Sequence, residues 1–389
     1  MSKRGWILVF LVAIGLVVWA ALLLRSPEPQ ASQAAPVFRG VQVEPQGAFR
    51  MVDGPAQISF PRDHGPHPDY LTEWWYYTGN LFTAEGQHFG YQLTFFRRAL
   101  LPPEDRAERT SSWAADQVYM AHFALTDTGA GTFSSFERFS RGAAGLAGAQ
   151  AEPVYQVWLE DWQVTEVSAG RYRLEAKSGE VSIALDLVDI KGPVLQGEGG
   201  YSPKGAQPGN ASIYNSQTRL GSAGTITVGE EQYAVSGLSW MDHEYSTSAL
   251  GEGLVGWDWF SLQLDDGSEL MLFLLRHEDG TLDPYSSGTL IQSDGSTRPL
   301  AAEEFEITPT GTWTSPHTGA RYPAAWEIRV PGEEIALAVR PRLADQEMRL
   351  SFVYWEGAVR VEGQRQGGPV SGNGYVELTG YAHSMQGEF

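Results

Sequence analysis

Two short segments of this chain hold the side chains that acid chemistry on an apolar substrate would need. They are Asp242-His243-Glu244-Tyr245 and Trp257-Asp258-Trp259. Addition of water to an isolated alkene needs a strong proton donor, because its slow step forms a carbocation, and a carboxylic acid kept neutral by apolar surroundings can donate. Aromatic faces stabilise such a cation by about 0.5–2 kcal/mol each. The candidate catalytic residues are therefore Asp242, His243, Tyr245 and Asp258.

Strand alternation limits how these side chains can act together. In an extended segment Trp257 and Trp259 share one face and Asp258 lies on the other, so only one set can face a barrel interior. Residues 242–244 follow a strand that we expect to end near Trp240, which would place them at a barrel rim, where functional loops are common. The alternative is structural: the tryptophans fill a core, and the aspartates cap turns or lie at the surface.

Two aromatic hairpins form the frame on which this chemistry would rest. Residues 73–80 and 256–262 are strand-like aromatic runs, and each leads through a glycine turn, at Gly86 or Gly267, into a second apolar strand. The repeated pattern suggests a duplicated β-architecture around an apolar cavity with a few ionisable groups. The side chains that we expect to contact a ligand are Glu73, Trp74, Trp75, Tyr77, His122, Trp240, Trp257 and Trp259.

Three histidines outside these segments, His64, His67 and His122, are also candidates for a binding role. His122 lies in an apolar strand whose alternation suits a barrel interior, and the alternative is a hydrogen-bonded core histidine. His64, His67, Asp69 and Glu73 could ligate a metal, but a short loop spacing is a weak signal, since catalytic zinc normally needs three supported ligands. We expect no metal and no cofactor.

Short segments rich in β-forming residues, separated by Gly, Ser and Pro, fill the body of the chain. This alternation of short strand-like segments and turns predicts an all-β fold with few helices, built as a sandwich or as barrels. Gly and Ser interrupt the strand pattern at residues 216–224, where we place a domain boundary. The prediction is a first barrel at residues 47–220 and a second at 221–389.

The N-terminus predicts export. Lys3 and Arg4 precede an uncharged run at residues 5–24, and about 20 helical residues suffice to cross a bilayer. Residues 1–25 therefore resemble a signal-anchor, although small residues at 32–34 leave a cleaved signal peptide open. Residues 26–46, rich in Pro, Ala, Gln and Ser, are typical of a flexible linker. We expect a periplasmic or other extracytoplasmic body, anchored to the inner membrane by the N-terminal helix.

The amino-acid composition argues against several classes of partner and site. The formal net charge of −20 disfavours nucleic acid as a partner. The chain has no cysteine, which excludes disulfides, thiolate metal sites and a cysteine nucleophile. The 13 Trp, 16 Tyr and 17 Phe are an unusual aromatic load, which favours a hydrophobic small-molecule ligand.

An ordered set of motifs resembles a known family. The motifs include His64-Gly65-Pro66-His67, Glu73-Trp74-Trp75-Tyr76-Tyr77-Thr78-Gly79, Ser239-Trp240-Met241-Asp242-His243-Glu244-Tyr245 and Gly256-Trp257-Asp258-Trp259-Phe260. Together they resemble the AttH-like proteins and the related hydroxyneurosporene synthases, which are carotenoid 1,2-hydratases. The resemblance implies two tandem lipocalin-like antiparallel β-barrels. Tyr245 stands where the hydratases are expected to have Trp, so the chain is more similar to the AttH-like group.

Three functions follow from these observations. The first is an exported lipocalin-type protein that binds a lipid or isoprenoid and, as the resemblance implies, serves an ABC transport system. The second is a cofactor-independent hydro-lyase that adds water to a carbon–carbon double bond, as a carotenoid 1,2-hydratase does. The third and weakest is a lipid-ester hydrolase, although the sequence has no Gly-x-Ser-x-Gly motif.

Overall fold

The computed structural model describes residues 49–106, 111–248 and 250–387. The expected anchor at 1–25 and linker at 26–46 lie outside the described residues. Within the described ranges, no helix has the length and hydropathy required to cross a membrane.

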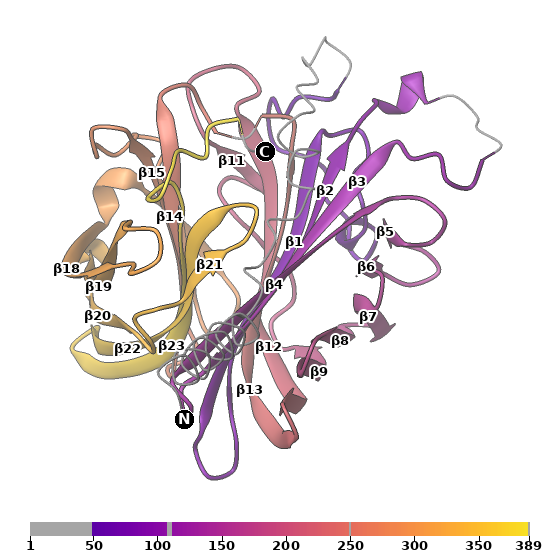
Figure 1. Ribbon diagram of the computed structural model, residues 1–389. Helices are drawn as coiled ribbons and strands as arrows, with labels where there is room; N and C mark the ends of the chain where they lie inside the picture. Colours follow the sequence, from indigo (N-terminus) through magenta and orange to yellow (C-terminus); the bar gives the residue numbers. More distant parts are fainter. Residues whose placement is uncertain (1–48, 107–110, 249, 388–389) are drawn as a thin grey trace, which may run out of the picture. The chain divides into compact units, whose positions relative to one another are not determined.

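The chain folds into two antiparallel sheets, so the all-β prediction is confirmed (Figure 1). The helices of the described residues are four 3-10 helices of three residues each: η1 (Arg62–His64), η2 (Pro103–Asp105), η3 (Ala302–Glu304) and η4 (Pro331–Glu333).

The first sheet has 13 strands and uses the chain up to Ser246. Its path runs β4 (Thr132–Arg141), β3 (Gln117–Asp127), β2 (His88–Ala99), β1 (Thr72–Phe82), β13 (Glu231–Ser246), β12 (Ala211–Val228), β9 (Val181–Asp189), β8 (Arg171–Ser178), β7 (Trp162–Ser168), β6 (Gln156–Leu159) and β5 (Ala147–Gln150), with β10 (Val194–Leu195) and β11 (Tyr201–Pro203) paired to β12.

The second sheet has ten strands and begins at Leu254. Its path runs β17 (Thr297–Ala301), β16 (Ser287–Ile291), β15 (Glu269–His277), β14 (Leu254–Leu264), β23 (Gly368–Leu378), β22 (Val353–Arg365), β20 (Ile335–Pro341), β19 (Arg321–Val330) and β18 (Glu306–Thr314), with β21 (Glu347–Arg349) paired to β22.

Each sheet curls around its own hydrophobic core, which gives two lipocalin-like barrels in tandem. Trp75, Tyr77 and Trp162 are fully buried in the first core, and Trp326 and Trp355 are fully buried in the second. Large aromatic side chains therefore fill both barrel interiors, and each interior is a packed core.

The two aromatic hairpins predicted from the sequence are β1–β2 and β14–β15. Their turn glycines adopt nearly the same left-handed backbone, with φ of +87° at Gly86 and +84° at Gly267. This conformation suits glycine, because a Cβ atom would be strained there. In both sheets the hairpin supplies the third and fourth strands from one end of the strand order.

The strand pattern shows no break at residues 216–224, where the sequence predicted a domain boundary. These residues lie inside β12, which pairs with β13 and β9 along its length. The glycines mark close packing between strands: a Cβ atom at Gly224 would lie 2.1 Å from the carbonyl oxygen of Ala184. The change of sheet comes later, between Ser246 and Leu254.

The outer faces of the two barrels pack against each other. Tyr76, Tyr214 and Trp240 from the first sheet cluster with Trp259 and Phe273 from the second. This third apolar cluster lies between the sheets and outside both barrel interiors.

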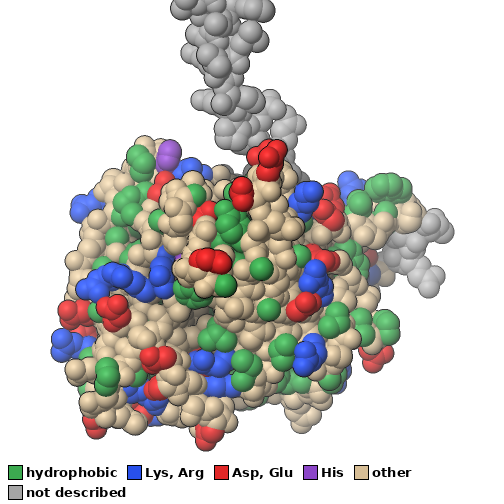
Figure 2. All heavy atoms as spheres, turned by 90° about the horizontal axis from the view of Figure 1, so that it is seen from below, with side chains coloured by type: hydrophobic (Ala, Val, Ile, Leu, Met, Phe, Trp, Pro, Cys, Tyr) green, Lys and Arg blue, Asp and Glu red, His purple; other side chains and the backbone are tan. Residues whose placement is uncertain are grey.

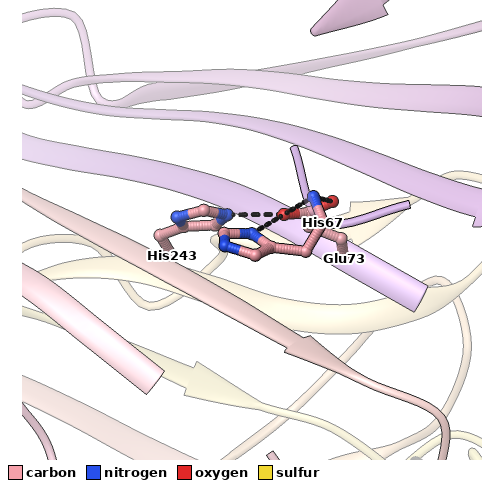
Figure 3. A group of neighbouring side chains, drawn as sticks. All are labelled: His67, Glu73 and His243. Carbon is pink, nitrogen blue, oxygen red and sulfur yellow. Dashed lines mark hydrogen bonds and ion pairs between the residues drawn. The ribbon is translucent and has the colours of Figure 1, made fainter. Parts of the chain in front are cut away.

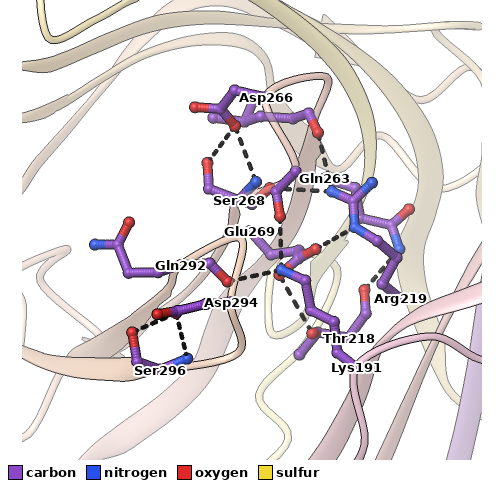
Figure 4. A network of polar contacts seen from close by, with 12 residues as sticks. Lys191, Thr218, Arg219, Gln263, Asp266, Ser268, Glu269, Gln292, Asp294 and Ser296 are labelled. Carbon is purple, nitrogen blue, oxygen red and sulfur yellow. Dashed lines mark hydrogen bonds and ion pairs between the residues drawn. The ribbon is translucent and has the colours of Figure 1, made fainter.

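A buried polar network joins the sheets at one end of this contact (Figure 4). The Glu269 carboxylate lies 2.6 Å from the Lys191 ammonium and also accepts a hydrogen bond from Arg219 Nε. Gln263 donates to the carbonyl oxygen of Thr218 at 2.7 Å. The network links β14 and β15 to β12 and to the segment after β9.

Charged side chains of both signs are interspersed on the face shown in Figure 2. Ion pairs at the surface of the protein include Arg138–Asp161 and Arg173–Asp186. Such pairs each contribute only about 0–1 kcal/mol. The stability of the fold therefore depends mainly on its apolar cores and buried networks.

Candidate functional site

A cavity of about 120 Å³ lies between the two barrels. Its apolar wall includes Trp74 and Phe96 from the first sheet and Trp257, Trp259 and Phe273 from the second. An apolar cavity of about 150 Å³ can hold benzene. The space is only partly enclosed, so one ring or a short segment of a chain fits inside while the rest of a larger molecule extends through the opening.

Three carboxyl groups, Asp242, Glu244 and Glu377, also line this cavity. Alternation along β13 turns Asp242 and Glu244 to the same face, and Glu377 comes from β23. Glu244 accepts a hydrogen bond from Ser212 Oγ and lies 3.3 Å from the Lys204 ammonium. The cavity thus combines aromatic walls with a small polar group.

Asp242 is held by three hydrogen-bond donors. Its Oδ1 accepts from Trp240 Nε1 at 2.7 Å and from Ser216 Oγ, and its Oδ2 accepts from the Tyr214 hydroxyl at 2.7 Å. Burial raises the pKa of Asp242 to about 7 and outweighs these donors, which favour the ionised form. Near neutral pH about half of this group is a neutral acid.

Glu377 is a second buried carboxyl group with a raised pKa. Burial raises its pKa to about 7, although a 2.8 Å hydrogen bond from Trp257 Nε1 opposes the shift. The charges of Glu244 and Asp242 raise its pKa further. Two groups that can donate protons near neutral pH therefore share one cavity with indole and phenol rings.

His243 and Tyr245 lie on the opposite face of β13. The predicted rim position was wrong, because β13 continues to Ser246 and pairs with β1 and β12 up to its end. Within a strand, neighbouring side chains point to opposite faces. His243 and Tyr245 are therefore absent from the wall that Asp242 helps to form.

Asp258 is also separated from the cavity. The predicted alternation in β14 is confirmed: Trp257 and Trp259 line the cavity, and Asp258 faces the other way. There its Oδ1 accepts a hydrogen bond from Arg276 Nε at 2.9 Å, and its Oδ2 accepts one from the Tyr381 hydroxyl at 3.0 Å. The Asp242, His243 and Asp258 side chains do not form one catalytic group.

His67, Glu73 and His243 form a second polar cluster (Figure 3). Glu73 Oε1 lies 2.9 Å from His67 Nδ1 and 2.8 Å from His243 Nε2, and Oε2 accepts from Arg97 Nε at 2.8 Å. Burial raises the pKa of Glu73, but Arg97 and both imidazoles outweigh it and hold this pKa well below its usual range. Burial lowers the pKa of His243.

This cluster has the donor set of a metal site, with its three ligand atoms within 4.8 Å of one another. Glu73 already accepts hydrogen bonds on both oxygens, and the Arg97 guanidinium opposes a second cation beside it. Hydrogen bonding and charge pairing explain the arrangement without a metal. His64 and Asp69, the other two suggested ligands, are outside the group.

Several predicted ligand-binding residues belong to structural layers. Trp75 and Tyr77 point into the first barrel, where the Trp75 ring stacks on His243 with centroids 5.0 Å apart. Tyr245 stacks on His67 at 3.7 Å. Trp240 lies behind the cavity wall, where it orients Asp242.

His122 faces away from the first barrel, in contrast to the predicted interior position. Met120 and Ala124, on the same face of β3, pack against Met348, Phe352 and other residues of the second half of the chain. The odd-numbered residues of β3, such as Phe123, face the barrel interior instead. The prediction had the right periodicity and the wrong face.

The sequence reasoning missed Glu244, Glu377, Tyr214, Lys204 and Tyr354 as cavity residues. Alternation from Asp242 could have identified Glu244. The other four come from strands or segments distant in sequence, and no local pattern brings them to this wall.

Comparisons with known proteins agree with this fold. The AttH-like family model matches residues 51–381. An AttH protein from Nitrosomonas europaea, known from a crystal structure, is 35% identical, with a TM-score of 0.74 and coverage of 85% of this chain and 99% of that one. Kievitone hydratase from Nectria haematococca shares the fold at 15% identity, with a TM-score of 0.63 and coverage of 86% and 98%. The comparison with curated proteins yields no match. The chain belongs to the AttH-like family.

Proposed function

We propose that the cavity between the barrels binds one end of a largely apolar small molecule, such as a lipid or an isoprenoid. The observation that carries this proposal is the aromatic wall to which both sheets contribute, with Trp74 and Phe96 opposite Trp257 and Trp259. Ligand sites are typically apolar, with a few polar groups that fix orientation. Because the space is small and partly open, a long ligand would insert one end.

Neutral Asp242 and Glu377 would orient that end. A protonated carboxyl group can donate a hydrogen bond to a ligand oxygen, and Lys204 can donate another. This polar group favours a ligand whose buried end carries an oxygen atom over a plain hydrocarbon.

Quenching of tryptophan fluorescence by cis-parinaric acid, a polyene fatty acid, tests the proposal on the purified full-length chain. We expect saturable quenching that Trp257→Ala weakens about tenfold, since aromatic contacts contribute about 0.5–1.5 kcal/mol beyond area burial. Trp158→Ala is the matched control, because Trp158 lies in β6 and outside the cavity wall. Unsaturable quenching, or equal effects of the two variants, would contradict the proposal.

A second candidate is acid-catalysed addition of water to a carbon–carbon double bond. It is favoured by Asp242, a buried acid with a pKa near 7 beside the Trp240 indole and the Tyr214 phenol. Asp242→Asn should then abolish turnover and leave ligand binding nearly intact, since general acid catalysis contributes about 10²–10⁴-fold. The ester-hydrolase hypothesis has less support, because no histidine is among the described residues that line the cavity.

The proposal includes attachment to the inner membrane on its outer side and service to an ABC transporter. Its support is the sequence pattern at residues 1–25 and the family resemblance. Membrane fractionation, followed by mass spectrometry of what co-purifies with the native protein, tests both points. Recovery in the cytosolic fraction would contradict the location.

A further inference from the structure

A row of three hydrogen-bonded side chains crosses the contact between the barrels and ends at the cavity. Tyr354 of β22 lines the cavity, and its hydroxyl lies 2.7 Å from His122 Nδ1 on β3. His122 Nε2 lies 3.0 Å from Glu137 Oε1 on β4. His122 is fully buried and Tyr354 is 4% exposed, so water competes little for these hydrogen bonds.

The chemistry of Glu137 fixes the direction of its own hydrogen bond with His122. Its Oε1 also accepts from the Ser351 backbone N–H at 3.1 Å, and its Oε2 accepts from Ser351 Oγ at 2.7 Å. Burial raises the pKa of Glu137, but the hydrogen bonds from His122 and Ser351 outweigh it and hold this pKa below its usual value. An ionised carboxylate only accepts hydrogen bonds, so His122 Nε2 must carry the hydrogen.

The His122 tautomer then decides what Tyr354 can do. In a neutral imidazole with hydrogen on Nε2, Nδ1 is the acceptor, so the Tyr354 hydroxyl donates to it. The hydrogen of Tyr354 is thereby directed away from the cavity, and a lone pair of its oxygen remains for a ligand. Catalytic triads order a carboxylate, an imidazole and a hydroxyl in the same way.

We propose that Tyr354, positioned by His122 and Glu137, accepts a hydrogen bond and a proton from a hydroxyl group of the molecule bound in the cavity. The inference rests on the proposed ligand-binding function and narrows its ligand class to apolar alcohols, phenols or enols. The ligand O–H bond breaks and its proton moves to the Tyr354 oxygen, while the Tyr354 proton moves to His122 Nδ1. The ligand oxygen keeps the electron pair, and the imidazolium is paired with the Glu137 carboxylate.

The arrangement complements the acids on the cavity wall. Asp242 and Glu377 can donate a proton, and Tyr354 can accept one, so the same cavity holds both partners of an acid–base reaction. Burial raises the pKa of the Tyr354 phenol well above its usual value, so Tyr354 stays neutral until its proton has somewhere to go. His122 provides that acceptor.

Two matched aromatic probes test the inference on the full-length chain. 2-Naphthol can donate a hydrogen bond, whereas 2-methoxynaphthalene has nearly the same shape and cannot. We expect 2-naphthol to bind about tenfold more tightly, the effect of one hydrogen bond to a polarised acceptor. Tyr354→Phe removes only the hydroxyl, and should abolish this preference and leave the binding of 2-methoxynaphthalene unchanged.

The outcomes separate the two proposals. Equal affinities of the probes for the natural chain would overturn the role of Tyr354 and leave the ligand-binding function standing. If neither probe binds saturably, the binding function fails and the inference fails with it. A preference that persists in Tyr354→Phe would assign the acceptor to another group, such as Glu244, and would also overturn the inference.

A fluorescence measurement tests the proton transfer itself. Excited 2-naphthol is a strong acid, so the bound probe should emit as naphtholate when a proton acceptor touches its hydroxyl. Glu137→Gln keeps the contacts to His122 and Ser351 but removes the negative charge that stabilises the imidazolium. Probe affinity should stay the same and naphtholate emission should fall; a purely structural role for Glu137 predicts that both properties change together or that neither does.

Discussion

The acid in the cavity wall makes the stability of this protein depend on pH in a specific way. Asp242 is 4% exposed, and burial raises its pKa from 3.8 to about 7. Asp242→Asn keeps the shape of the side chain and removes its titration. An amide at this position can accept from Trp240 Nε1 through its oxygen and donate to the Tyr214 oxygen through its nitrogen.

The direction of this pH dependence follows from the linkage between proton binding and folding. A pKa that is higher in the folded state means that the folded chain binds this proton more tightly than the unfolded chain. The stabilisation is complete below pH 3.8, falls as the pH rises, and is lost above pH 7. The full difference between the folded and unfolded pKa (7 minus 3.8) corresponds to about 4 kcal/mol, of which about 2 kcal/mol falls between pH 5 and pH 7.

Urea unfolding at pH 5, 6, 7 and 8 measures this change. We expect the free energy of unfolding of the natural chain, relative to Asp242→Asn, to drop by about 2 kcal/mol from pH 5 to pH 7 and to change little between pH 7 and pH 8. Asp161→Asn is the control: hydrogen bonding to Arg138 lowers the pKa of Asp161, so it should not titrate in this range. Parallel curves for the natural chain and Asp242→Asn would refute a pKa near 7 for Asp242.

Three further predictions concern the buried framework. Glu73→Gln leaves the Arg97 guanidinium without its carboxylate and should lower the free energy of unfolding by about 3–5 kcal/mol in urea titrations, with a negligible change contradicting the ion pair. Gly224→Ala places a methyl group against the backbone of β9 and should cost about 1–3 kcal/mol or more by the same measurement, whereas Gly221→Ala, whose nearest atom is a flexible side-chain end, should cost less. Glu269→Gln leaves the partly buried cations of Lys191 and Arg219 without their carboxylate and should lower the melting temperature; a melting temperature equal to that of the natural chain would contradict this role.

Local sequence patterns predicted the strands, the hairpins and the glycines of their turns. These features depend on neighbours in sequence: alternation, β-branched and aromatic residues, and the conformational freedom of glycine. The Gly and Ser residues at 216–224 misled the domain assignment for the same reason. Small residues mark both flexible links and close strand packing, and only the contact with Ala184 on β9 distinguishes the two at Gly224.

The candidate site was harder to predict, because alternation gives the relation between neighbouring side chains but not the direction of either set. It separated Trp257 and Trp259 from Asp258 correctly. Alternation could not predict that these two tryptophans face the other barrel. The same ambiguity placed His122 inside the first barrel, whereas it bonds to Tyr354 of the second sheet.

The position of the cavity follows from how the aromatic side chains are distributed. Inward-facing rings such as Trp75 and Trp326 fill the two barrel cores, so neither interior needs a ligand to be complete. The outward-facing rings on the packed sides must cover each other instead, and two curved sheets meet less regularly than the layers within one core. Asp242 and Glu377, whose pKa values burial raises, line the space left between them. His243, the next residue along β13, points into the first barrel and bonds to Glu73. Substitution of Asp242 should therefore change what the cavity binds or does, and substitution of His243 should change how well the first barrel is held together.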